Sequence, residues 1–457
     1  FFRERSDDVR DLAGRLQRHV RKPKAEPSAS LAGRVAVLAD LAPSRMVSLC
    51  AEGVAAVLAG GGGATSHAAL LARSLDLPLV VGLGDFLHEV RDGQNVLVDA
   101  SAGEVVLDPP ESLVAEAMQT ATAGVQALRE AYGDQDVRSG RIRFEANVSL
   151  WGDAVRADEN DADGIGLYRT EFAFLMRPDL PGEAEQSALY RRIVETVAPK
   201  PVTFRLLDAG GDKLVPGLGL SAEPNPFLGY RSLRLLLDHP EILLAQARAI
   251  LSALKGTEGR LLVPMVGSVE EFREVRRVLA DAGLSLPHFG AMIELPCALL
   301  QVEEIAAEAD FLCVGTNDLT QHILGVDRTN ARVTRYFDMC HPSVVRALAR
   351  IARATADAGK SLSICGEGAS DPLLLALWLG LGVERLAVHS TRLRILRTLE
   401  AQLDEEAARA SIAELLTLDR ADDIAARLAD LAAPEVQQFS RGQRRAHEGP
   451  ETAPHPA

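Results

Sequence analysis

The sequence lacks the long apolar segments and the cysteine patterns that identify membrane and secreted proteins. No apolar run approaches the roughly 20 residues that a membrane-spanning helix needs, and the chain does not open with a signal-peptide pattern. Its five cysteines are an odd number, widely spaced and without a CxxC pair, which argues against a disulfide framework and a cysteine zinc site. We therefore expect a cytoplasmic protein that has no membrane role.

Positive charge is scarce as well, and lysine in particular. The 49 Lys and Arg residues are outnumbered by 64 Asp and Glu, which gives a formal net charge of -15, and only six of the 49 are lysine. So acidic a chain lacks the basic field that nucleic acids and anionic membranes require, which excludes a general role on either. An anionic ligand would have to be bound by local arginines, whose planar guanidinium groups suit phosphate and carboxylate groups.

The chain does have length and clear periodicity. Its 457 residues suffice for about three domains, or for one small domain and a large barrel. Residues 34–108 alternate short apolar runs with turn residues, as in a compact α/β or β-rich unit. Residues 114–132 carry apolar side chains three and four apart, which predicts an amphipathic helix joining two bodies. Residues 433–457 are polar and aperiodic, which predicts a disordered tail.

Strand-like segments dominate the rest of the chain. Eight of them follow one another between residues 142 and 388, with helical segments between them, and they include residues 202–207, 311–315 and 361–365. Eight strand and helix units over roughly 260 residues predict a closed (β/α)₈ barrel of the TIM type. The fold class is therefore α/β, with a smaller α/β domain in front of the barrel. A doubly wound open sheet is the main alternative.

The most specific local pattern is AGGGGATSHAALLAR at residues 59–73. Its four consecutive glycines would let an anion approach the backbone closely, and Thr65 and Ser66 are N-cap residue types before a helix-forming segment. His67 would then lie in the first turn of a helix, where the dipole keeps the imidazole neutral and nucleophilic and stabilises an attached phosphoryl group. From residue types alone, a tight connection with a solvated histidine remains an alternative.

Charged residues stand where the predicted barrel strands end, which is where the active sites of such barrels lie. Three guanidinium groups on one face would repel each other unless a multiply charged anion neutralised them. Glu294 and Asp318 offer the hard oxygen ligands that Mg²⁺ takes. Each residue alone could instead be a surface ion pair, a core residue or a turn cap, but their joint placement predicts a site for a small phosphorylated acid. The set is Arg169, Arg205, Asp208, Glu294, Asn317, Asp318, Arg328 and Cys365.

Together these segments resemble enzyme I of the phosphoenolpyruvate-dependent sugar phosphotransferase system, from residue 1 to about residue 430. The motifs that carry the resemblance are GGGATSHAALLARSLDLPLVVG, DGIGLYRTEFAFL, RLLDAGGDK, NPFLGYRSLR, GAMIELP, VGTNDLTQHILGVDRTN and ICGEGASDP. The resemblance implies that the chain transfers the phosphoryl group of phosphoenolpyruvate to its own His67, releasing pyruvate, for onward transfer to the carrier protein HPr.

The resemblance also implies roles for individual residues. His67 would be the phosphorylated histidine, and Cys365 would protonate the leaving enolpyruvate. Glu294 and Asp318 would bind Mg²⁺. The residues that would bind phosphoenolpyruvate are Arg169, Arg205, Arg231, Asn317, Asp318 and Arg328.

By the same resemblance the chain divides into four parts. Residues 1–110 would be an incomplete, swivelling phosphohistidine domain of α/β type, and residues 111–136 a linker helix about which it pivots. Residues 137–432 would form the phosphoenolpyruvate-binding barrel, through which a homodimer would assemble, and residues 433–457 the tail. The HPr-docking subdomain would precede Phe1, so that the chain is expected to be an N-terminally truncated member of the family.

Two motifs depart from the family pattern and keep alternatives open. After the LAPS segment the chain has Arg45 and Met46 where the family usually has an acid and a Thr, and the last strand ends in Ala387-Val388-His389 instead of Ser-Met-Ser. One alternative is a fragment of an enzyme like pyruvate phosphate dikinase or phosphoenolpyruvate synthase. The other is a catalytically inactive module that senses phosphoenolpyruvate.

Overall fold

The structure is a computed structural model of the chain. It describes residues 31, 33–39, 43–61, 72, 77–100, 103–114, 117, 139–175, 177, 179–213, 215–221, 223–286, 288–328, 330, 332–432 and 436. His67, most of the predicted 114–132 helix and nearly all of the predicted 433–457 tail lie outside the described residues. The chain divides into two compact units, a smaller one up to Ala117 and a larger one that holds the barrel.

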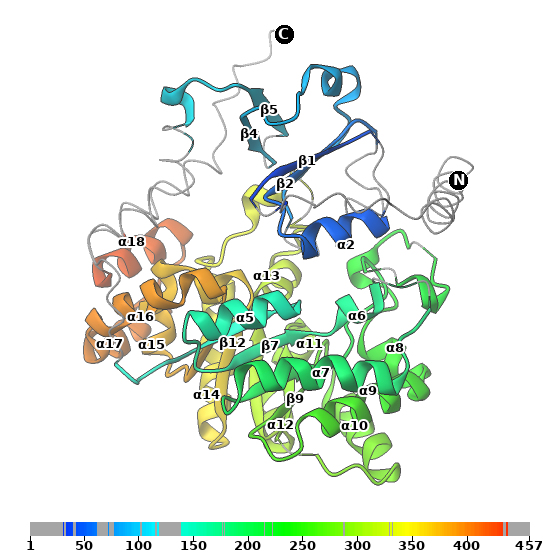
Figure 1. The fold of residues 1–457 in the computed structure, drawn as a ribbon. Coiled ribbons are helices and arrows are strands. Elements are labelled where there is room, and N and C mark those ends of the chain that lie inside the picture. Colours follow the sequence, from blue (N-terminus) through cyan, green and yellow to red (C-terminus); the bar gives the residue numbers. More distant parts are fainter. Residues whose placement is uncertain are drawn as a thin grey trace. The chain divides into compact units, whose positions relative to one another are not determined.

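The smaller unit contains a parallel three-stranded sheet and an antiparallel hairpin (Figure 1). In the sheet, β1 pairs with β2 and β2 with β3, and helix α2 connects β1 to β2, as parallel pairing requires. Met46 and Leu49 of α2 are buried, as is all of β2. The elements are β1 (Val35–Leu38), α2 (Pro43–Ala51), β2 (Ala56–Ala59), β3 (Leu79–Val80), the 3₁₀ helix η1 (Gly84–Glu89), β4 (Val96–Asp99) and β5 (Glu104–Leu107).

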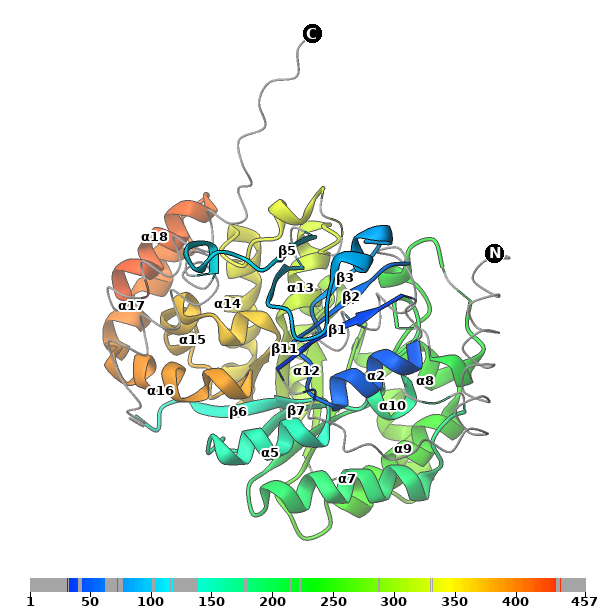
Figure 2. The same cartoon turned by 45° about the horizontal axis from the view of Figure 1, so that its top comes forward.

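The larger unit is a closed barrel of eight parallel strands (Figures 1 and 2). Each strand pairs with its neighbours in chain order, and β13 closes the barrel by pairing with β6. The predicted (β/α)₈ barrel is thus confirmed, and the alternative, a doubly wound open sheet, is excluded. The strands are β6 (Arg143–Val148), β7 (Ile165–Arg169), β8 (Val202–Arg205), β9 (Arg260–Val263), β10 (His288–Ile293), β11 (Phe311–Gly315), β12 (Ser361–Cys365) and β13 (Arg385–Val388).

Helices surround the barrel (Figure 2), and apolar side chains of the strands and helices form one buried core. The α-helices are α5 (Trp151–Glu159), α6 (Glu171–Leu175), α7 (Glu183–Val197), α8 (Leu233–Asp238), α9 (Pro240–Ala253), α10 (Val269–Asp281), α11 (Pro296–Leu300), α12 (Val302–Glu308), α13 (Thr316–Leu324), α14 (Pro342–Asp357), α15 (Leu375–Gly380), α16 (Leu393–Gln402), α17 (Glu405–Leu415) and α18 (Ala421–Leu431). The 3₁₀ helices are η2 (Pro216–Leu218), η3 (Pro226–Leu228), η4 (Thr334–Tyr336), η5 (Glu367–Ser370), η6 (Pro372–Leu374) and η7 (Ser390–Arg392).

The inside of the barrel is filled with side chains in layers. Near the amino ends of the strands, Arg260 donates to Glu145 at 3.1 Å, and both are buried. Above this ion pair lies an apolar cluster formed by Leu167, Leu262, Met292, Phe311, Cys313, Cys365 and Ala387. The described interior of the barrel is therefore a packed core, and active sites of such barrels lie at the carboxyl end.

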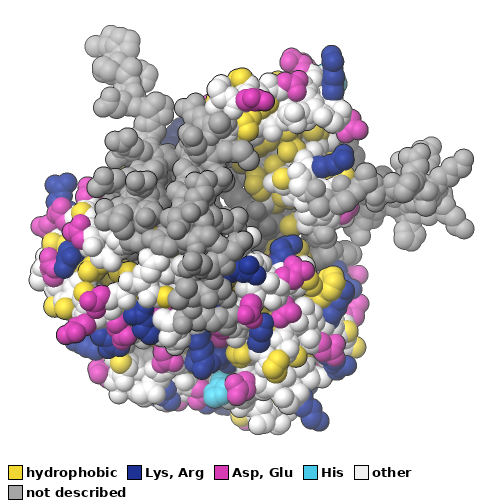
Figure 3. Space-filling model, turned by 60° about the vertical axis from the view of Figure 1, so that its left-hand side comes forward, with side chains coloured by type: hydrophobic (Ala, Val, Ile, Leu, Met, Phe, Trp, Pro, Cys, Tyr) yellow, Lys and Arg dark blue, Asp and Glu magenta, His cyan; other side chains and the backbone are white. Residues whose placement is uncertain are grey.

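The outer surface mixes charges of both signs. In the view of Figure 3, Lys and Arg side chains lie interspersed with Asp and Glu. Many of these cations have partners: Arg273 lies 2.7 Å from Glu308, for example, and Arg409 lies 2.8 Å from Glu405. In the described part of the chain, no helix is both long enough and apolar enough to cross a membrane.

Candidate active site

The barrel brings the carboxyl ends of its strands to one rim, where most of the predicted site residues lie. Arg169, the last residue of β7, pairs in register with Arg205, the last residue of β8. Cys365 at the end of β12 pairs with Gly315 at the end of β11. Directly after strands β10 and β11 come Glu294, Asn317 and Asp318. The strand ends thus bring together residues that lie far apart in the chain.

Two carboxylates hold Arg205 in place. Its Nη2 donates to Glu171 Oε1 at 2.6 Å and lies 3.4 Å from Asp208 Oδ2, and all three side chains are buried. The same Glu171 oxygen accepts the backbone N–H of Asp208 at 3.2 Å, so Glu171 also fixes the loop after β8. Burial by itself would lower the pKa of Arg205, but the neighbouring carboxylates outweigh burial and raise this pKa. Arg205 is therefore a permanent cation.

Asp208 also binds Arg231, which lies 23 residues further along the chain. Arg231 Nη2 is 2.9 Å from Oδ2 and 3.0 Å from Oδ1 of Asp208, and Nε is 3.2 Å from Oδ1. A glycine permits this approach, because a Cβ on Gly210 would lie 2.3 Å from the carbonyl oxygen of Tyr230. One aspartate therefore draws two guanidinium groups together.

Asp318 extends this network to a third arginine. Its Oδ1 lies 3.9 Å from Arg231 Nη1, and its Oδ2 lies 4.0 Å from Arg328 Nη1. The Arg328 side chain is 27% exposed, whereas the side chains of Arg205 and Arg231 are buried. Three arginines thus converge through two aspartates, and Arg328 is the one that solvent reaches.

Glu294 and Asp318 are the carboxylates expected to bind a cation. Glu294 is buried, and its Oε1 accepts the backbone N–H of Met265 at 2.7 Å. A Cβ on Gly315 would lie 2.3 Å from its other oxygen, Oε2. Burial and the charges of Asp318 and Asp208 raise the pKa of Glu294 to about 7.

These two carboxylates fit a divalent cation, because a bound cation would relieve the repulsion that raises the pKa of Glu294. Among the residues that the structure describes, no group of three or more His, Cys, Asp or Glu side chains is arranged to hold a metal. Mg²⁺ is compatible with this arrangement, since it takes one or two protein carboxylates and completes its shell with water and substrate oxygens.

The turn after β12 packs against the beginning of α13. Thr316 Oγ1 donates to the carbonyl oxygen of Cys365 at 2.8 Å, and Asn317 Oδ1 accepts the backbone N–H of Glu367 at 2.9 Å. Gly366 has a φ of 92°, and a Cβ there would lie 2.4 Å from Thr316 Oγ1. These contacts place the Cys365 strand end beside Asn317.

The Cys365 thiol is buried below the rim. The neighbouring Cys313 thiol and burial together raise the pKa of Cys365 well above its ordinary value. At neutral pH this side chain is therefore a protonated thiol, the form that can give up a proton.

Comparison with known proteins identifies the family. Residues 128–405 match the family model described as PEP-utilising enzyme, PEP-binding domain, and residues 31–103 match the model described as PEP-utilising enzyme, mobile domain. The chain belongs to the PEP-utilising enzymes. The region matched by the PEP-binding model contains the barrel, and the region matched by the mobile-domain model lies within the smaller unit.

Three bacterial relatives show how far the similarity of this PEP-utilising enzyme extends. Two are named phosphoenolpyruvate-dependent phosphotransferase system: a Salmonella typhimurium protein, 36% identical over 89% of this chain and 56% of its own length, and an Escherichia coli protein, 37% identical over 85% and 54%. A Staphylococcus carnosus protein named phosphoenolpyruvate-protein phosphotransferase is 34% identical over 90% of this chain and 75% of its own length. The chain thus spans little more than half of the first two relatives.

Sequence reasoning missed three residues of this PEP-utilising enzyme. Glu171 lies two positions after Arg169 in the RTEF motif, and Glu367 lies two positions after Cys365 in ICGEG. Cys313 precedes Gly315 by two positions, so strand alternation places both on the inner surface of the barrel. For Glu171 and Glu367, the available signal was an acidic residue two positions after a predicted site residue.

The two departures from the family pattern lie in different parts of the chain, Arg45-Met46 in the smaller unit and Ala387-Val388-His389 in the barrel. Met46 is fully buried in the smaller unit, and Arg45 lies 3.8 Å from Glu52 at the surface. Ala387 fills the barrel interior, and its carbonyl oxygen accepts from Asn147 Nδ2 at 2.9 Å. His389 is exposed at the rim, with Nδ1 2.9 Å from Thr391 Oγ1. The last strand therefore adds an imidazole at the carboxyl end of the barrel.

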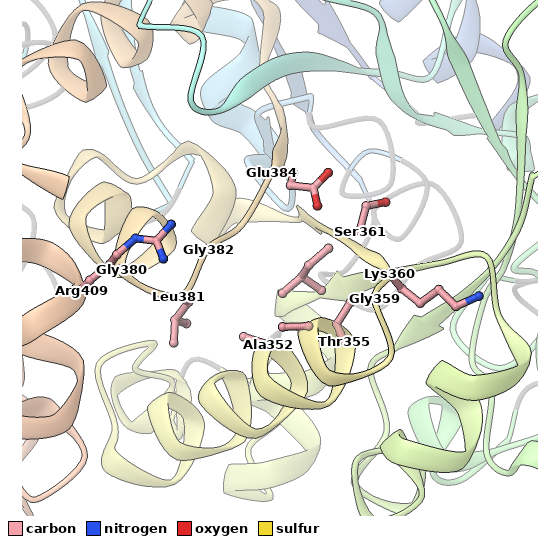
Figure 4. Close-up of a pocket in the computed structure, with 12 residues that line it drawn as sticks. Ala352, Thr355, Gly359, Lys360, Ser361, Gly380, Leu381, Gly382, Glu384 and Arg409 are labelled. Carbon is pink, nitrogen blue, oxygen red and sulfur yellow. The ribbon is translucent and has the colours of Figure 1, made fainter. Parts of the chain in front are cut away.

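A separate pocket of about 560 Å³ lies at the opposite end of strands β12 and β13 (Figure 4). Lys360, Ser361, Glu384 and Arg409 contribute its polar lining. Ser361 begins β12 and Glu384 precedes β13, so this pocket lies at the amino end of the barrel. It is therefore separate from the rim that carries the arginines.

Proposed function

We propose that this chain is a phosphoenolpyruvate-protein phosphotransferase, which moves the phosphoryl group of phosphoenolpyruvate to its own His67 and releases pyruvate. The observation that carries the proposal is the convergence of Arg205, Arg231 and Arg328 through two aspartates at the carboxyl end of the barrel. The family models and the names of the relatives support it.

The substrate is a small acid with a phosphate at one end and a carboxylate at the other. The planar forks of Arg169, Arg205, Arg231 and Arg328, with the Asn317 amide, would bind both anionic ends and neutralise charge that develops on the moving phosphoryl group. Asp208 and Glu171 hold Arg205 and Arg231 in fixed positions, so little reorganisation is needed when the substrate binds.

Glu294 and Asp318 would hold Mg²⁺ beside these arginines. When bound, Mg²⁺ supplies positive charge that polarises substrate oxygens. The buried Glu294 carboxylate is fixed by its hydrogen bond from Met265, so one oxygen is oriented before any ligand arrives.

The proposed reaction involves phosphoenolpyruvate, His67 and Cys365. The bond between phosphorus and the enol oxygen breaks, and a bond forms between phosphorus and a nitrogen of His67. The enolate that leaves takes a proton at C3 from the Cys365 thiol, which gives pyruvate and a thiolate. Solvent then returns a proton to Cys365.

His67 belongs to the region matched by the mobile-domain model, so its meeting with the substrate would depend on domain motion. The phosphoryl group would then pass to HPr. We propose that the chain works in the cytoplasm and assembles as a homodimer through the barrel.

The second candidate is an inactive module that senses phosphoenolpyruvate, and the Ala387-Val388-His389 strand end is the observation that favours it. Such a module would bind phosphoenolpyruvate without converting it. Measurable release of pyruvate would exclude it.

The test is to incubate the chain with ³²P-labelled phosphoenolpyruvate and Mg²⁺. We expect an acid-labile, base-stable protein label and an equal amount of pyruvate, with no label on His67→Ala. A wild-type chain that takes up no label, or a His67→Ala chain that takes up as much, would refute the proposal. Labelling of His67 from ATP in place of phosphoenolpyruvate would instead indicate an enzyme like pyruvate phosphate dikinase.

A further inference from the structure

Two thiols touch inside the barrel, just below the rim. Cys313 lies in β11 and Cys365 ends β12, and their Sγ atoms are 3.6 Å apart. Cys313 pairs in register with Ser363, two positions before Cys365, so strand alternation turns both thiols toward the barrel interior. The exposed fractions are 1% for Cys313 and 3% for Cys365.

The thiols form a short chain of hydrogen bonds. The Cys313 thiol donates to Cys365 Sγ, and the Cys365 thiol donates to the carbonyl oxygen of Val314 at 3.3 Å. The Cys365 sulfur therefore accepts one hydrogen bond while its own hydrogen rests on the backbone. This arrangement fixes the direction of a thiol that would otherwise rotate freely.

The surroundings make the loss of a proton from Cys365 costly. Apolar side chains, among them Leu167, Leu262 and Met292, share the same cluster. A thiolate formed there is a buried charge, which is expensive unless a hydrogen-bond donor or a cation compensates it. The contact with Cys313 and burial both raise the pKa of Cys365, so the thiol keeps its proton until a substrate takes it.

We propose that Cys313 is a positioning residue for proton transfer, which holds the Cys365 thiol in the orientation from which it protonates enolpyruvate. This inference rests on the proposed function. In this step the S–H bond of Cys365 breaks, its electron pair stays on sulfur, and the enolate electrons form the new C3–H bond of pyruvate. Cys313 keeps its own proton throughout.

The test uses the reverse proton transfer, which needs no phosphorylated histidine. Chains incubated with pyruvate and Mg²⁺ in D₂O exchange the methyl protons of pyruvate, and proton NMR follows the exchange. The variants are Cys313→Ser, which keeps a donor, and Cys313→Ala, which removes it. Cys340→Ala is the matched control, because Cys340 is a buried cysteine outside the interior cluster.

We expect Cys313→Ala to slow the exchange by about tenfold, the usual effect of losing one hydrogen bond that orients the reacting group. The KM for pyruvate should stay within twofold of wild type, because Cys313 acts through Cys365 and not on the substrate. Cys313→Ser should recover the rate to within about threefold of wild type, and Cys340→Ala should match wild type. Cys365→Ala should abolish the exchange.

Two results would overturn the inference: a Cys313→Ala chain that exchanges as fast as wild type, or a Cys313→Ser chain as slow as Cys313→Ala. If wild type forms pyruvate from phosphoenolpyruvate and either result is found, the inference alone fails. If wild type neither exchanges pyruvate protons nor forms pyruvate, the proposed function fails and the inference fails with it. Thermal unfolding of each variant shows whether it is folded.

Discussion

The guanidinium group of Arg205 and the carboxylate of Glu171 are joined by a 2.6 Å hydrogen bond, and both side chains are buried. Loss of Glu171 would leave the buried Arg205 with Asp208 alone, at 3.4 Å, and loss of Arg205 would leave the buried Glu171 without the cation that balances it. The site therefore depends on Glu171, which would not contact the substrate but holds an arginine that would.

We expect Glu171→Ala to lower the free energy of unfolding by about 3–5 kcal/mol, the usual cost of breaking a buried ion pair. Urea denaturation measures it. Glu308→Ala is the control, because Glu308 pairs with Arg273 at the surface and its loss should cost at most about 1 kcal/mol. Equal losses in the two variants would contradict this account of the pair.

A second prediction concerns Glu294 and pH. Its pKa of about 7 lies above that of an unfolded glutamate, so the folded chain holds this proton more tightly. The resulting stabilisation is complete below the unfolded pKa and is lost as the pH rises through about 7. Above pH 7 the ionised carboxylate therefore destabilises the metal-free fold.

Glu294→Gln removes this charge and should raise the free energy of unfolding at pH 8 in EDTA by about 1–3 kcal/mol. At pH 4, below the pKa of an unfolded glutamate, the difference from wild type should nearly vanish. Thermal or urea unfolding at the two pH values measures it. A variant that is equally destabilised at both pH values would show that the Glu294 charge does not oppose folding.

A third prediction concerns Gly315, over which a Glu294 oxygen lies. Gly315→Ala would place a Cβ 2.3 Å from Glu294 Oε2, so the carboxylate must move. We expect Mg²⁺ binding, followed by calorimetry, to weaken at least about tenfold, the effect of losing one charged contact.

Gly152→Ala is the matched control, because a Cβ there would meet only the end of the Arg156 side chain, at 3.7 Å. This variant should bind Mg²⁺ as wild type does. Unchanged Mg²⁺ binding by Gly315→Ala would remove Glu294 from the cation site.

The barrel could be predicted from the sequence because each strand is a short apolar segment that ends in turn or charged residues. Predicted strands such as 311–315 and 361–365 coincide with β11 and β12, whereas the predicted 202–207 strand ends at Arg205. The strand ends at Arg205 because side chains bind the loop that follows it. In that loop, Glu171 accepts a hydrogen bond from the backbone N–H of Asp208.

The site could be predicted less completely. Strand ends placed Arg205, Glu294 and Cys365 on one rim, which follows from parallel pairing alone. The contact between Asp208 and Arg231 could not be predicted. The two residues are 23 positions apart, and the loop that contains Gly210 brings them together. The Cys313 contact was missed as well, since neighbours on a diagonal depend on strand register. The role of His67 stays a prediction.

The central claim is that arginines at the rim bind phosphoenolpyruvate together. The direct measurement is calorimetric titration of phosphoenolpyruvate with Mg²⁺ into a His67→Ala chain, which cannot turn over. The account predicts one site per chain, binding at least about tenfold weaker in Arg231→Lys or Arg328→Gln, and unchanged binding in the surface variant Arg273→Lys. If the two rim variants bound phosphoenolpyruvate as tightly as the Arg273→Lys chain, the claim would be contradicted.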